Sequence, residues 1–224
     1  MESLKSIFKD GMLLVVEKPA GITIEEAAEL LSAHSELERS GIAHRLDKDT
    51  SGVLLVALTP EMLSYLQEQF QERLVRKTYL ALVSGNITEE QGRIEAPLGR
   101  SPGDRRKQKA YGSTEPHKGT VREAVTEYRV KERLPGYTLL EVFPKTGRKH
   151  QIRAHLASIG HPIAGDKLYG FKDQVNPPGL TRQFLHASQL QLTMPDGEEK
   201  TFTSQLPEDL HNILNALKTH ENDN

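Results

Sequence analysis

Cysteine is absent from this chain of 224 residues, which excludes a disulfide framework and any zinc or iron–sulfur site with cysteine ligands. No apolar run approaches the ~20 residues that a membrane-spanning helix needs. The first residues also lack the charged-then-apolar layout of a secretory signal peptide. With 36% hydrophobic and 27% charged residues and a mean hydropathy of -0.54, the composition is typical of a globular protein. We therefore expect no membrane partner and a cytoplasmic location.

The net charge is small, because the chain contains 29 Lys and Arg residues and 31 Asp and Glu residues. The charges are nevertheless segregated along the chain. Residues 24–38 contain five acids and no Lys or Arg, residues 99–109 contain five bases and one acid, and residues 145–153 contain four bases and no acid. Such segregation can create a basic face for phosphates on a nearly neutral protein. Solvated basic loops would give the same counts.

Hydrophobic periodicity predicts interleaved strands and helices. Strands are expected at residues 12–16, 53–58, 78–83, 120–133, 137–143 and 184–192, and helices at 23–37, from 59 onward, at 149–159 and at 207–217. Residues 94–119 are rich in proline, glycine and bases and are predicted to form an extended loop region. Several connections are too short for crossover helices. We therefore expect an α+β fold, with a mixed, mainly antiparallel central sheet flanked by helices.

Local signals support two of these helices. Thr23 and Glu26 have the spacing of a capping box, and Pro60 suits the first position of a helix. In the helix at 149–159, Ile152 and Ile159 are expected on one buried face together with Leu156.

The most informative segment is GIAHRLDKDTSG at residues 41–52. It places basic, acidic and hydroxyl side chains in a loop directly before the apolar run at 53–58. A polar loop carried by a buried strand is a common setting for a reactive group.

The sequence HRLDKDTSG resembles the catalytic motif of the RluA-type RNA pseudouridine synthases, which isomerise uridine in structured RNA. Three further segments match that family in the same order: LLVVEKPAG at 13–21, RKTYLALV at 76–83, and KTGRKHQIRAHL at 145–156, which runs on into GHPIAGDKLYG at 160–170. Four motifs in order are far more specific than one. The resemblance implies the pseudouridine synthase catalytic fold in a single domain at 1–224. Only 43 residues precede His44, so we expect no N-terminal S4 domain.

The resemblance also implies three catalytic residues. Asp47 aligns with the essential aspartate, and the sequence leaves open whether it acts as nucleophile or as base. Arg153 aligns with the arginine that pairs with this aspartate, and a guanidinium can keep a carboxylate ionised. Tyr79 aligns with the active-site tyrosine, whose ring can stack on a flipped uracil. The alternatives are a turn-capping aspartate, a helix-surface arginine and a half-buried strand tyrosine. Asp49 is interpreted as a turn residue.

Other polar residues are expected to contact RNA. Arg45 resembles the arginine that fills the stack vacated by the extruded base, an extrusion that costs ~a few kcal/mol. His44 is expected to contact a neighbouring base or the backbone. Phosphate contacts position RNA without reading its sequence. The candidates for them are Lys77, Arg105, Arg106, Lys107, Lys109, Arg148 and Lys149.

Pseudouridine formation breaks the N1–C1′ bond, rotates the uracil and rejoins it through C5, so that no group enters or leaves. We therefore expect neither cofactor nor metal, and we predict a monomeric RNA pseudouridine synthase that acts on large-subunit ribosomal RNA, transfer RNA or both. One alternative is an RNA-binding module without activity. Another is a metal-dependent hydrolase using His150, His155 and His161, although their spacing differs from the two-histidine, one-turn zinc motif.

Overall fold

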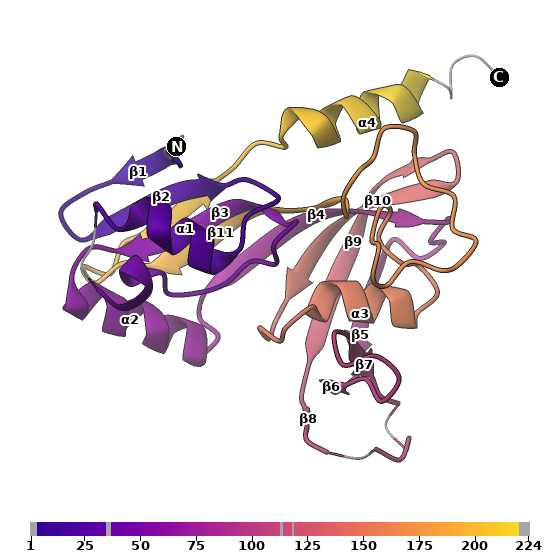
Figure 1. The fold of residues 1–224 in the computed structure, drawn as a ribbon, viewed down its shortest axis with the longest axis horizontal. Helices are drawn as coiled ribbons and strands as arrows, with labels where there is room; N and C mark the ends of the chain where they lie inside the picture. Colours follow the sequence, from indigo (N-terminus) through magenta and orange to yellow (C-terminus); the bar gives the residue numbers. More distant parts are fainter. Residues whose placement is uncertain (1–3, 35–36, 113, 118, 220–224) are drawn as a thin grey trace. The chain divides into compact units, whose positions relative to one another are not determined.

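The computed structural model describes residues 4–34, 37–112, 114–117 and 119–219 (Figure 1). The chain forms two compact units. The first unit comprises the residues up to Thr78 together with His186–Leu206, and the second comprises Tyr79–Leu185 together with the residues from Pro207 onward.

The first unit contains a mixed sheet with the strand order β1, β2, β3, β11, and β12 pairs with β11 on its other side. These strands are β1 (Lys5–Lys9), β2 (Leu13–Lys18), β3 (Ser51–Ala57), β11 (Leu185–Thr193) and β12 (Glu199–Thr203). Only the pairing of β3 with β11 is parallel, and it brings Ser51 opposite His186. The helical elements are α1 (Ile24–Leu31), the 3-10 helix η1 (Glu38–Gly41) and α2 (Pro60–Gln71).

Helices cover both faces of β2 and β3, and all seven residues of β3 are therefore buried. Alternate residues of a strand point to opposite faces. One face packs against α2 through Leu13, Val15, Val53, Leu55, Met62 and Leu66, and the other packs against α1 through Leu14, Val16, Leu54, Val56, Ile24 and Ala27. The strand that follows the polar loop is thus held from both sides.

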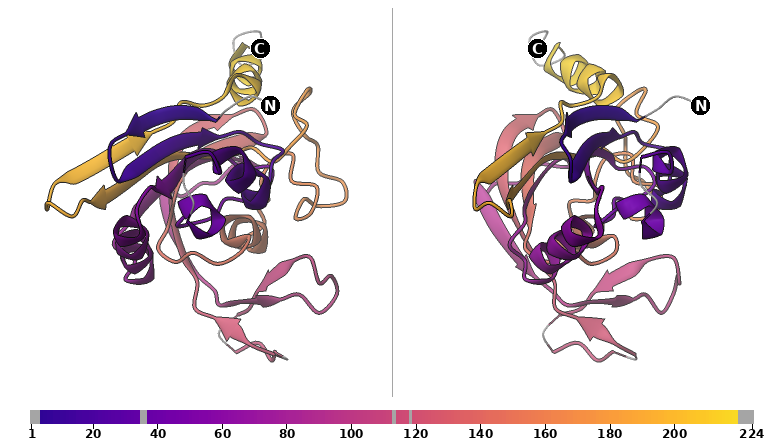
Figure 2. Two further views of the ribbon diagram at one scale, coloured as in Figure 1. Left: turned by 60° about the vertical axis from the view of Figure 1, so that its left-hand side comes forward. Right: turned by 90° about the vertical axis from the view of Figure 1, so that its left-hand side faces the viewer.

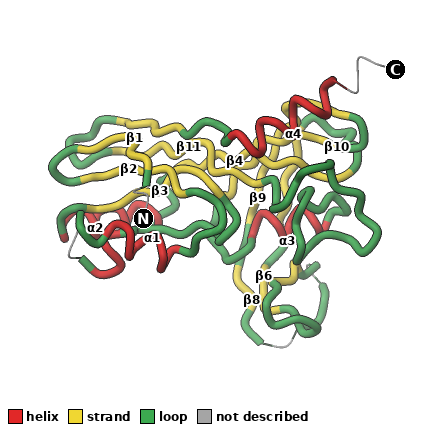
Figure 3. The backbone as a smooth tube through the Cα atoms, turned by 45° about the horizontal axis from the view of Figure 1, so that its top comes forward, coloured by secondary structure: helices red, strands yellow, loops and turns green. Residues whose placement is uncertain are grey.

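The second unit contains an antiparallel sheet in the order β4, β10, β9, β5. A small sheet in the order β7, β6, β8 projects from it (Figure 2). The bounds are β4 (Arg76–Ser84, which begins in the first unit), β5 (Gln91–Glu95), β6 (Leu98–Arg100), β7 (Gln108–Ala110), β8 (Val121–Arg122), β9 (Val125–Leu134), β10 (Tyr137–Pro144), α3 (Gln151–Ser158) and α4 (Glu208–Thr219). Residues 159–184 form loops and turns, drawn green in Figure 3.

The predicted fold class is confirmed, because the strands form mixed, mainly antiparallel sheets with flanking helices. The Thr23–Glu26 capping box is present, and Thr59 caps α2 with Pro60 at its start. The helix predicted at 23–37 was too long: α1 ends at Leu31, and residues 35 and 36 lie outside the described residues. No helix in the described ranges combines the length and apolar character needed to span a membrane.

Three further expectations need correction. Residues 94–119 are not simply a loop, because they contain the hairpin of β6 and β7, whose three-residue strands are too short to show periodicity. The strands β1 and β12 escaped prediction because their KSIFK and EKTFT sequences carry few apolar residues. Ile159 is 38% exposed rather than buried, since α3 ends one residue before it.

Candidate functional site

Asp47 is half-buried in the loop at residues 42–50, between η1 and β3. Backbone hydrogen bonds hold this loop in place. Thr50 N donates to the Asp47 carbonyl (3.0 Å), and Gly21 N donates to the Lys48 carbonyl (2.9 Å). The backbone that carries the carboxylate is therefore fixed by one hydrogen bond within the loop and by one from the turn at Gly21.

Lys18 provides a further tie to this loop, although it is not among the site residues predicted from the sequence. The side chain is almost fully buried, and its Nζ donates to the carbonyls of Pro19 (2.8 Å), Ile22 (2.9 Å) and Lys48 (3.0 Å). An ammonium group has three donors, so each one meets a carbonyl. This arrangement satisfies a buried charge that would otherwise be costly, and it joins the turn at 19–22 to the Asp47 loop.

Glycines are required at both ends of the Asp47 loop. Gly41 has φ +75°, and a Cβ there would lie 2.0 Å from the Ala57 carbonyl oxygen. Gly52 has φ +127°, and its Cβ would lie 2.2 Å from the Ala187 carbonyl oxygen. Both positions combine a left-handed conformation with close backbone approach, which only glycine tolerates.

His44 is integrated into the protein rather than projecting from it. Its Nε2 accepts a hydrogen bond from Leu55 N (3.0 Å), and its ring stacks on Phe70 with 4.8 Å between centroids. Burial, assisted by the charge of Lys77, lowers the pKa of His44 to about 3, so the ring is neutral at pH 7. Arg45, the neighbouring residue, is exposed. An RNA contact for either residue stays a prediction.

Lys77 is a second perturbed base of the first unit. Burial, with the charge of Arg73 in addition, lowers the pKa of Lys77 to about 8. Its positive charge is therefore lost on mild alkalinisation, unlike that of an exposed lysine.

Arg153, on α3 of the second unit, is buried in an ion pair with Asp166. Nε lies 2.7 Å from Oδ2, and Nη2 lies 2.9 Å from Oδ1. Burial alone would raise the pKa of Asp166, but the hydrogen bonds and charge of Arg153 outweigh it and lower that pKa. The alternative of a helix-surface arginine is excluded, because Arg153 is only 7% exposed. A guanidinium has five donors, so it can hold Asp166 and a second carboxylate together.

Buried side chains fix α3 against β9. Gln151 Nε2 donates to Thr126 Oγ1 (3.0 Å), and His155 Nδ1 shares a hydrogen bond with the same hydroxyl (2.8 Å). The other ring nitrogen of His155 is bonded to the Ala96 carbonyl (2.9 Å). Burial lowers the pKa of His155, which keeps the ring neutral. The polar side chains of this network all have hydrogen-bond partners, so α3 holds Arg153 rigidly.

The three histidines of the metallohydrolase alternative are bonded to protein groups. Both nitrogens of His155 are used in the network behind α3, His161 Nδ1 meets the Ser84 carbonyl (2.9 Å), and His150 Nδ1 meets the Tyr169 hydroxyl (3.1 Å). Within the described ranges, no group of three or more His, Asp or Glu residues is arranged to hold a metal ion.

Tyr79 lies on β4, half-buried and opposite Val142 of β10. It belongs with Arg153 to the second unit, whereas Asp47 belongs to the first. The structure thus shows the neighbours of Asp47 within the first unit and those of Tyr79 and Arg153 within the second. The pairing of Asp47 with Arg153, and the stacking role of Tyr79, stay predictions.

Four of the predicted phosphate ligands lie on one feature, the basic hairpin, which we define as residues 98–110. Arg105 is exposed on its turn. Arg106 is also exposed, and it pairs with Asp104 (Nη2–Oδ2 2.8 Å). Lys109 pairs with Glu115 (2.5 Å). The fourth is Lys107. Outside the hairpin, Arg148 is half-buried with its Nε on the Glu123 carbonyl (3.0 Å), and Lys149 is exposed.

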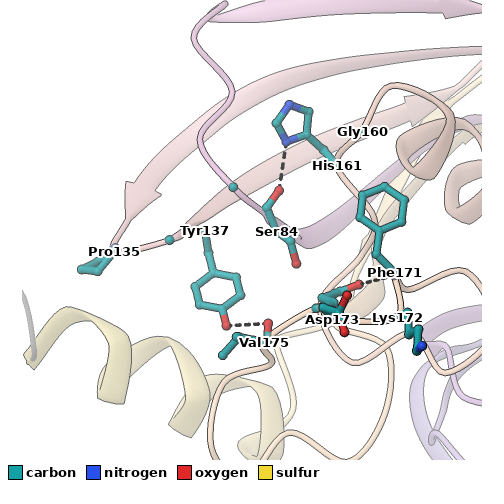
Figure 4. A pocket seen from close by; sticks show the side chains of 12 residues that line it. Ser84, Pro135, Tyr137, Gly160, His161, Phe171, Lys172, Asp173 and Val175 are labelled. Atoms are coloured by element: carbon teal, nitrogen blue, oxygen red, sulfur yellow. Dashed lines mark hydrogen bonds between the residues drawn. The ribbon is translucent and has the colours of Figure 1, made fainter.

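A surface pocket of about 630 Å³ opens elsewhere in the second unit (Figure 4). Ser84, Tyr137, His161 and Phe171 contribute to its lining, and the Tyr137 hydroxyl donates to the Val175 carbonyl (3.0 Å). Apart from His161 of the metal-dependent alternative, none of the site residues predicted from the sequence lines it. We therefore assign it no part in the candidate site.

Comparison with known proteins places these features in a family. The model of the RNA pseudouridylate synthase family matches residues 12–158. A ribosomal large subunit pseudouridine synthase D of Nitrosomonas europaea is 42% identical over 96% of this chain and 65% of its own length. A protein of the same name from Neisseria meningitidis serogroup A is 37% identical over 96% of this chain and 62% of its own length. The chain thus spans under two thirds of both relatives.

Two solved human structures have the same fold. Human RNA pseudouridylate synthase domain containing 1 superposes with a TM-score of 0.78 and 27% identity, covering 97% of this chain and 95% of that one. Human RNA pseudouridylate synthase domain containing 4 gives a TM-score of 0.77 and 26% identity, covering 96% and 93%. The family model, the similar proteins and structures, and the four ordered motifs agree. The chain belongs to the RNA pseudouridylate synthase family.

Proposed function

We propose that this chain is an RNA pseudouridine synthase that converts specific uridines of structured RNA into pseudouridine. The observation that carries the proposal is the family match across residues 12–158, which includes the loop that holds Asp47 on a fixed backbone. In the reaction the N1–C1′ bond breaks and a C5–C1′ bond forms. C5 loses its hydrogen and N1 gains one, so the product is an isomer of the substrate.

Asp47 is the proposed reacting group. An ionised carboxylate can attack as a nucleophile or remove a proton as a base, and both routes need it charged in a shielded site. Arg153 is proposed to supply the compensating charge, as a guanidinium already oriented by Asp166. Tyr79, half-buried on β4, is proposed to stack on the uracil.

The uridine has to leave its stack before it can react, because its target atoms are inaccessible inside a helix. Arg45, exposed two residues before Asp47, is proposed to fill the vacated space with its planar guanidinium. His44 is proposed to assist as a neutral ring beside it. The basic hairpin, with Lys77, Arg148 and Lys149, is proposed to hold the phosphates.

Large-subunit ribosomal RNA is the substrate class we propose, supported by the names of the Nitrosomonas and Neisseria relatives. Transfer RNA is the alternative that the test has to separate. We also propose that residues 1–224 act as one catalytic domain, because the family match includes parts of both units. Action as a monomer in the cytoplasm completes the proposal.

The test measures tritium release from RNA labelled at uracil C5. Unmodified large-subunit ribosomal RNA and transfer RNA transcripts are incubated separately with wild type, Asp47→Asn and Asp49→Asn. The two variants remove the same charge from half-buried aspartates two residues apart in one loop, so Asp49→Asn is a matched control.

We expect release from ribosomal RNA by wild type and by Asp49→Asn, and none above background by Asp47→Asn. Release from transfer RNA alone would overturn the proposed substrate but not the reaction. Equal activity in Asp47→Asn and wild type would overturn the assignment of Asp47. Binding of RNA without release from either class would leave an RNA-binding module as the function.

A further inference from the structure

The ring of Tyr169 lies next to two cations that the proposed function uses separately. The Arg153 guanidinium is 5.1 Å from the ring centroid, and Lys107 Nζ of the basic hairpin is 5.9 Å from it. Cations at this range are attracted by an aromatic face. The ring is 8% exposed and packs in an apolar cluster with Leu98 of the hairpin and Ala154 of α3. The same side chain therefore contacts both the hairpin and the helix that carries Arg153.

The hydroxyl of Tyr169 makes a second link to the basic hairpin. It accepts a hydrogen bond from the backbone N–H of Gln108 (2.7 Å) and shares another with His150 Nδ1 (3.1 Å). Gln108 begins β7 and pairs with Arg100 across the hairpin. This bond thus fixes the backbone directly after the basic turn at 101–107.

The position of Tyr169 depends on the residue that holds Arg153. Asp166 Oδ1 accepts the backbone N–H groups of Leu168 and Tyr169, each at 2.9 Å, while both oxygens hold the guanidinium. The turn closes with Gly170 N on the Asp166 carbonyl (2.9 Å). A Cβ at Gly170 would lie 2.6 Å from that carbonyl oxygen, so the turn requires glycine. One carboxylate therefore sets Arg153 and Tyr169 together.

We propose that Tyr169 is a positioning residue that links RNA docking on the basic hairpin to the orientation of Arg153. The inference rests on the proposed function, which gives the hairpin and Arg153 their roles. The two parts of the side chain have separable tasks. The hydroxyl holds the hairpin in the conformation that meets phosphates, and the ring holds the guanidinium. Neither part touches the reacting atoms.

The experiment separates these tasks with two substitutions in the full chain. Tyr169→Phe removes only the hydroxyl, whereas Tyr169→Leu removes the ring as well. Tyr137→Phe and Tyr137→Leu are matched controls, because Tyr137 is also 8% exposed and donates one hydrogen bond from its hydroxyl (3.0 Å). RNA affinity is measured across a salt series in the Asp47→Asn background, with ribosomal RNA transcript as probe. The single-turnover rate at saturating RNA is measured in otherwise wild-type enzyme.

Tyr169→Phe is expected to weaken RNA binding about three- to tenfold and to make its salt dependence shallower, while the rate at saturation stays within about twofold. Tyr169→Leu is expected to lower that rate at least about tenfold as well, because Arg153 loses its aromatic neighbour. The Tyr137 variants should change neither quantity beyond about twofold.

Unchanged affinity and salt slope in Tyr169→Phe would overturn the inference. So would equal saturating rates in Tyr169→Phe and Tyr169→Leu, or equal effects of the Tyr137 variants. If Tyr169→Leu fails to fold, Tyr169→Met, which also removes the ring, takes its place in the rate measurement, and Tyr169→Phe still decides the hairpin link. The binding measurement needs no turnover. Absence of tritium release by wild type therefore overturns the proposed function. The salt dependence of RNA affinity tests separately whether Tyr169 supports the basic hairpin.

Discussion

Single charged residues of the candidate site are buried together with specific partners. Lys18 directs its ammonium at three carbonyls, and Asp166 binds Arg153 through both carboxylate oxygens. Isolated buried charges are very costly, so each of these groups depends on its partners. Substitution at these positions should therefore affect stability as well as chemistry.

The Arg153–Asp166 pair can be compared with a second pair of similar geometry. Arg182 binds Asp209 through Nε (2.7 Å) and Nη2 (3.1 Å), but the Asp209 side chain is 53% exposed, whereas that of Asp166 is fully buried. We predict that Asp166→Ala lowers the free energy of unfolding by about 3–5 kcal/mol, because it removes a fully buried carboxylate that also accepts the backbone N–H groups of Leu168 and Tyr169. Asp209→Ala should cost about 1 kcal/mol. Urea unfolding of both variants checks this, and equal losses would contradict it.

His44 predicts a dependence of stability on acid pH. Its pKa is about 3 in the folded state against 6.5 as the ordinary value. Below pH 6.5 His44 is protonated in the unfolded chain but stays neutral in the folded chain. The free energy of unfolding therefore decreases as the pH falls toward about 3. The loss amounts to at most about 1.4 kcal/mol per pH unit. His44→Gln, which keeps an acceptor for Leu55 N, should show a smaller fall in unfolding free energy between about pH 7 and about pH 5.

The control for this experiment is His34→Gln, since His34 is exposed. Its pH dependence should match that of wild type. The comparison uses the change with pH and not the absolute stability, because His44→Gln also loses the stacking on Phe70. Parallel pH profiles for wild type and His44→Gln would show that His44 is not the acid-sensitive group.

At the scale of helices and strands, prediction succeeded where a local signal exists. The Thr23–Glu26 capping box and Pro60 mark the starts of α1 and α2, and the apolar run at 53–58 marks β3. It failed where structure depends on distant pairing. The three-residue strands of the basic hairpin are stabilised by packing on α3 and by the Tyr169 hydroxyl, and neither is visible in local periodicity.

The basic hairpin should contribute to RNA binding mainly through Arg105. Arg105 is exposed, whereas Arg106 is held by Asp104, a bond that lowers the pKa of Asp104 to about 2. We predict that Arg105→Ala weakens RNA binding and reduces the slope of log affinity against log salt by ~0.7–0.9 for each phosphate that the variant no longer neutralises. Arg106→Ala should have a smaller effect, because Asp104 already compensates its charge.

Filter binding over a salt series measures these slopes. Arg129→Ala is the control, because Arg129 lies on β9 and pairs with Glu141 (2.5 Å) outside the hairpin. It should leave the slope unchanged. An unchanged slope for Arg105→Ala would remove this residue from the RNA interface.

For the whole molecule, the sequence predicted the family and the candidate residues, but not how they are supported. The order of the motifs identified Asp47, Tyr79 and Arg153 as catalytic candidates, because each stands at a motif position that matches the family. Asp166 and Tyr169 stand in the last motif segment, yet nothing in their spacing indicates which arginine the carboxylate binds or which hairpin the hydroxyl meets. Those relations depend on tertiary packing, which a linear pattern does not contain.

The proposed pseudouridine synthase activity should survive removal of metal ions. The proposed isomerisation adds and releases no group, and both ring nitrogens of His155, the central histidine of the metal-dependent alternative, are bonded to Thr126 and Ala96. We predict that enzyme dialysed against a chelator releases tritium from C5-labelled RNA at the wild-type rate. The substrate should be a short stem–loop folded in monovalent salt, so that chelation does not unfold the RNA. Loss of release that zinc or another divalent ion restores, with the RNA fold verified in parallel, would favour the metal-dependent alternative.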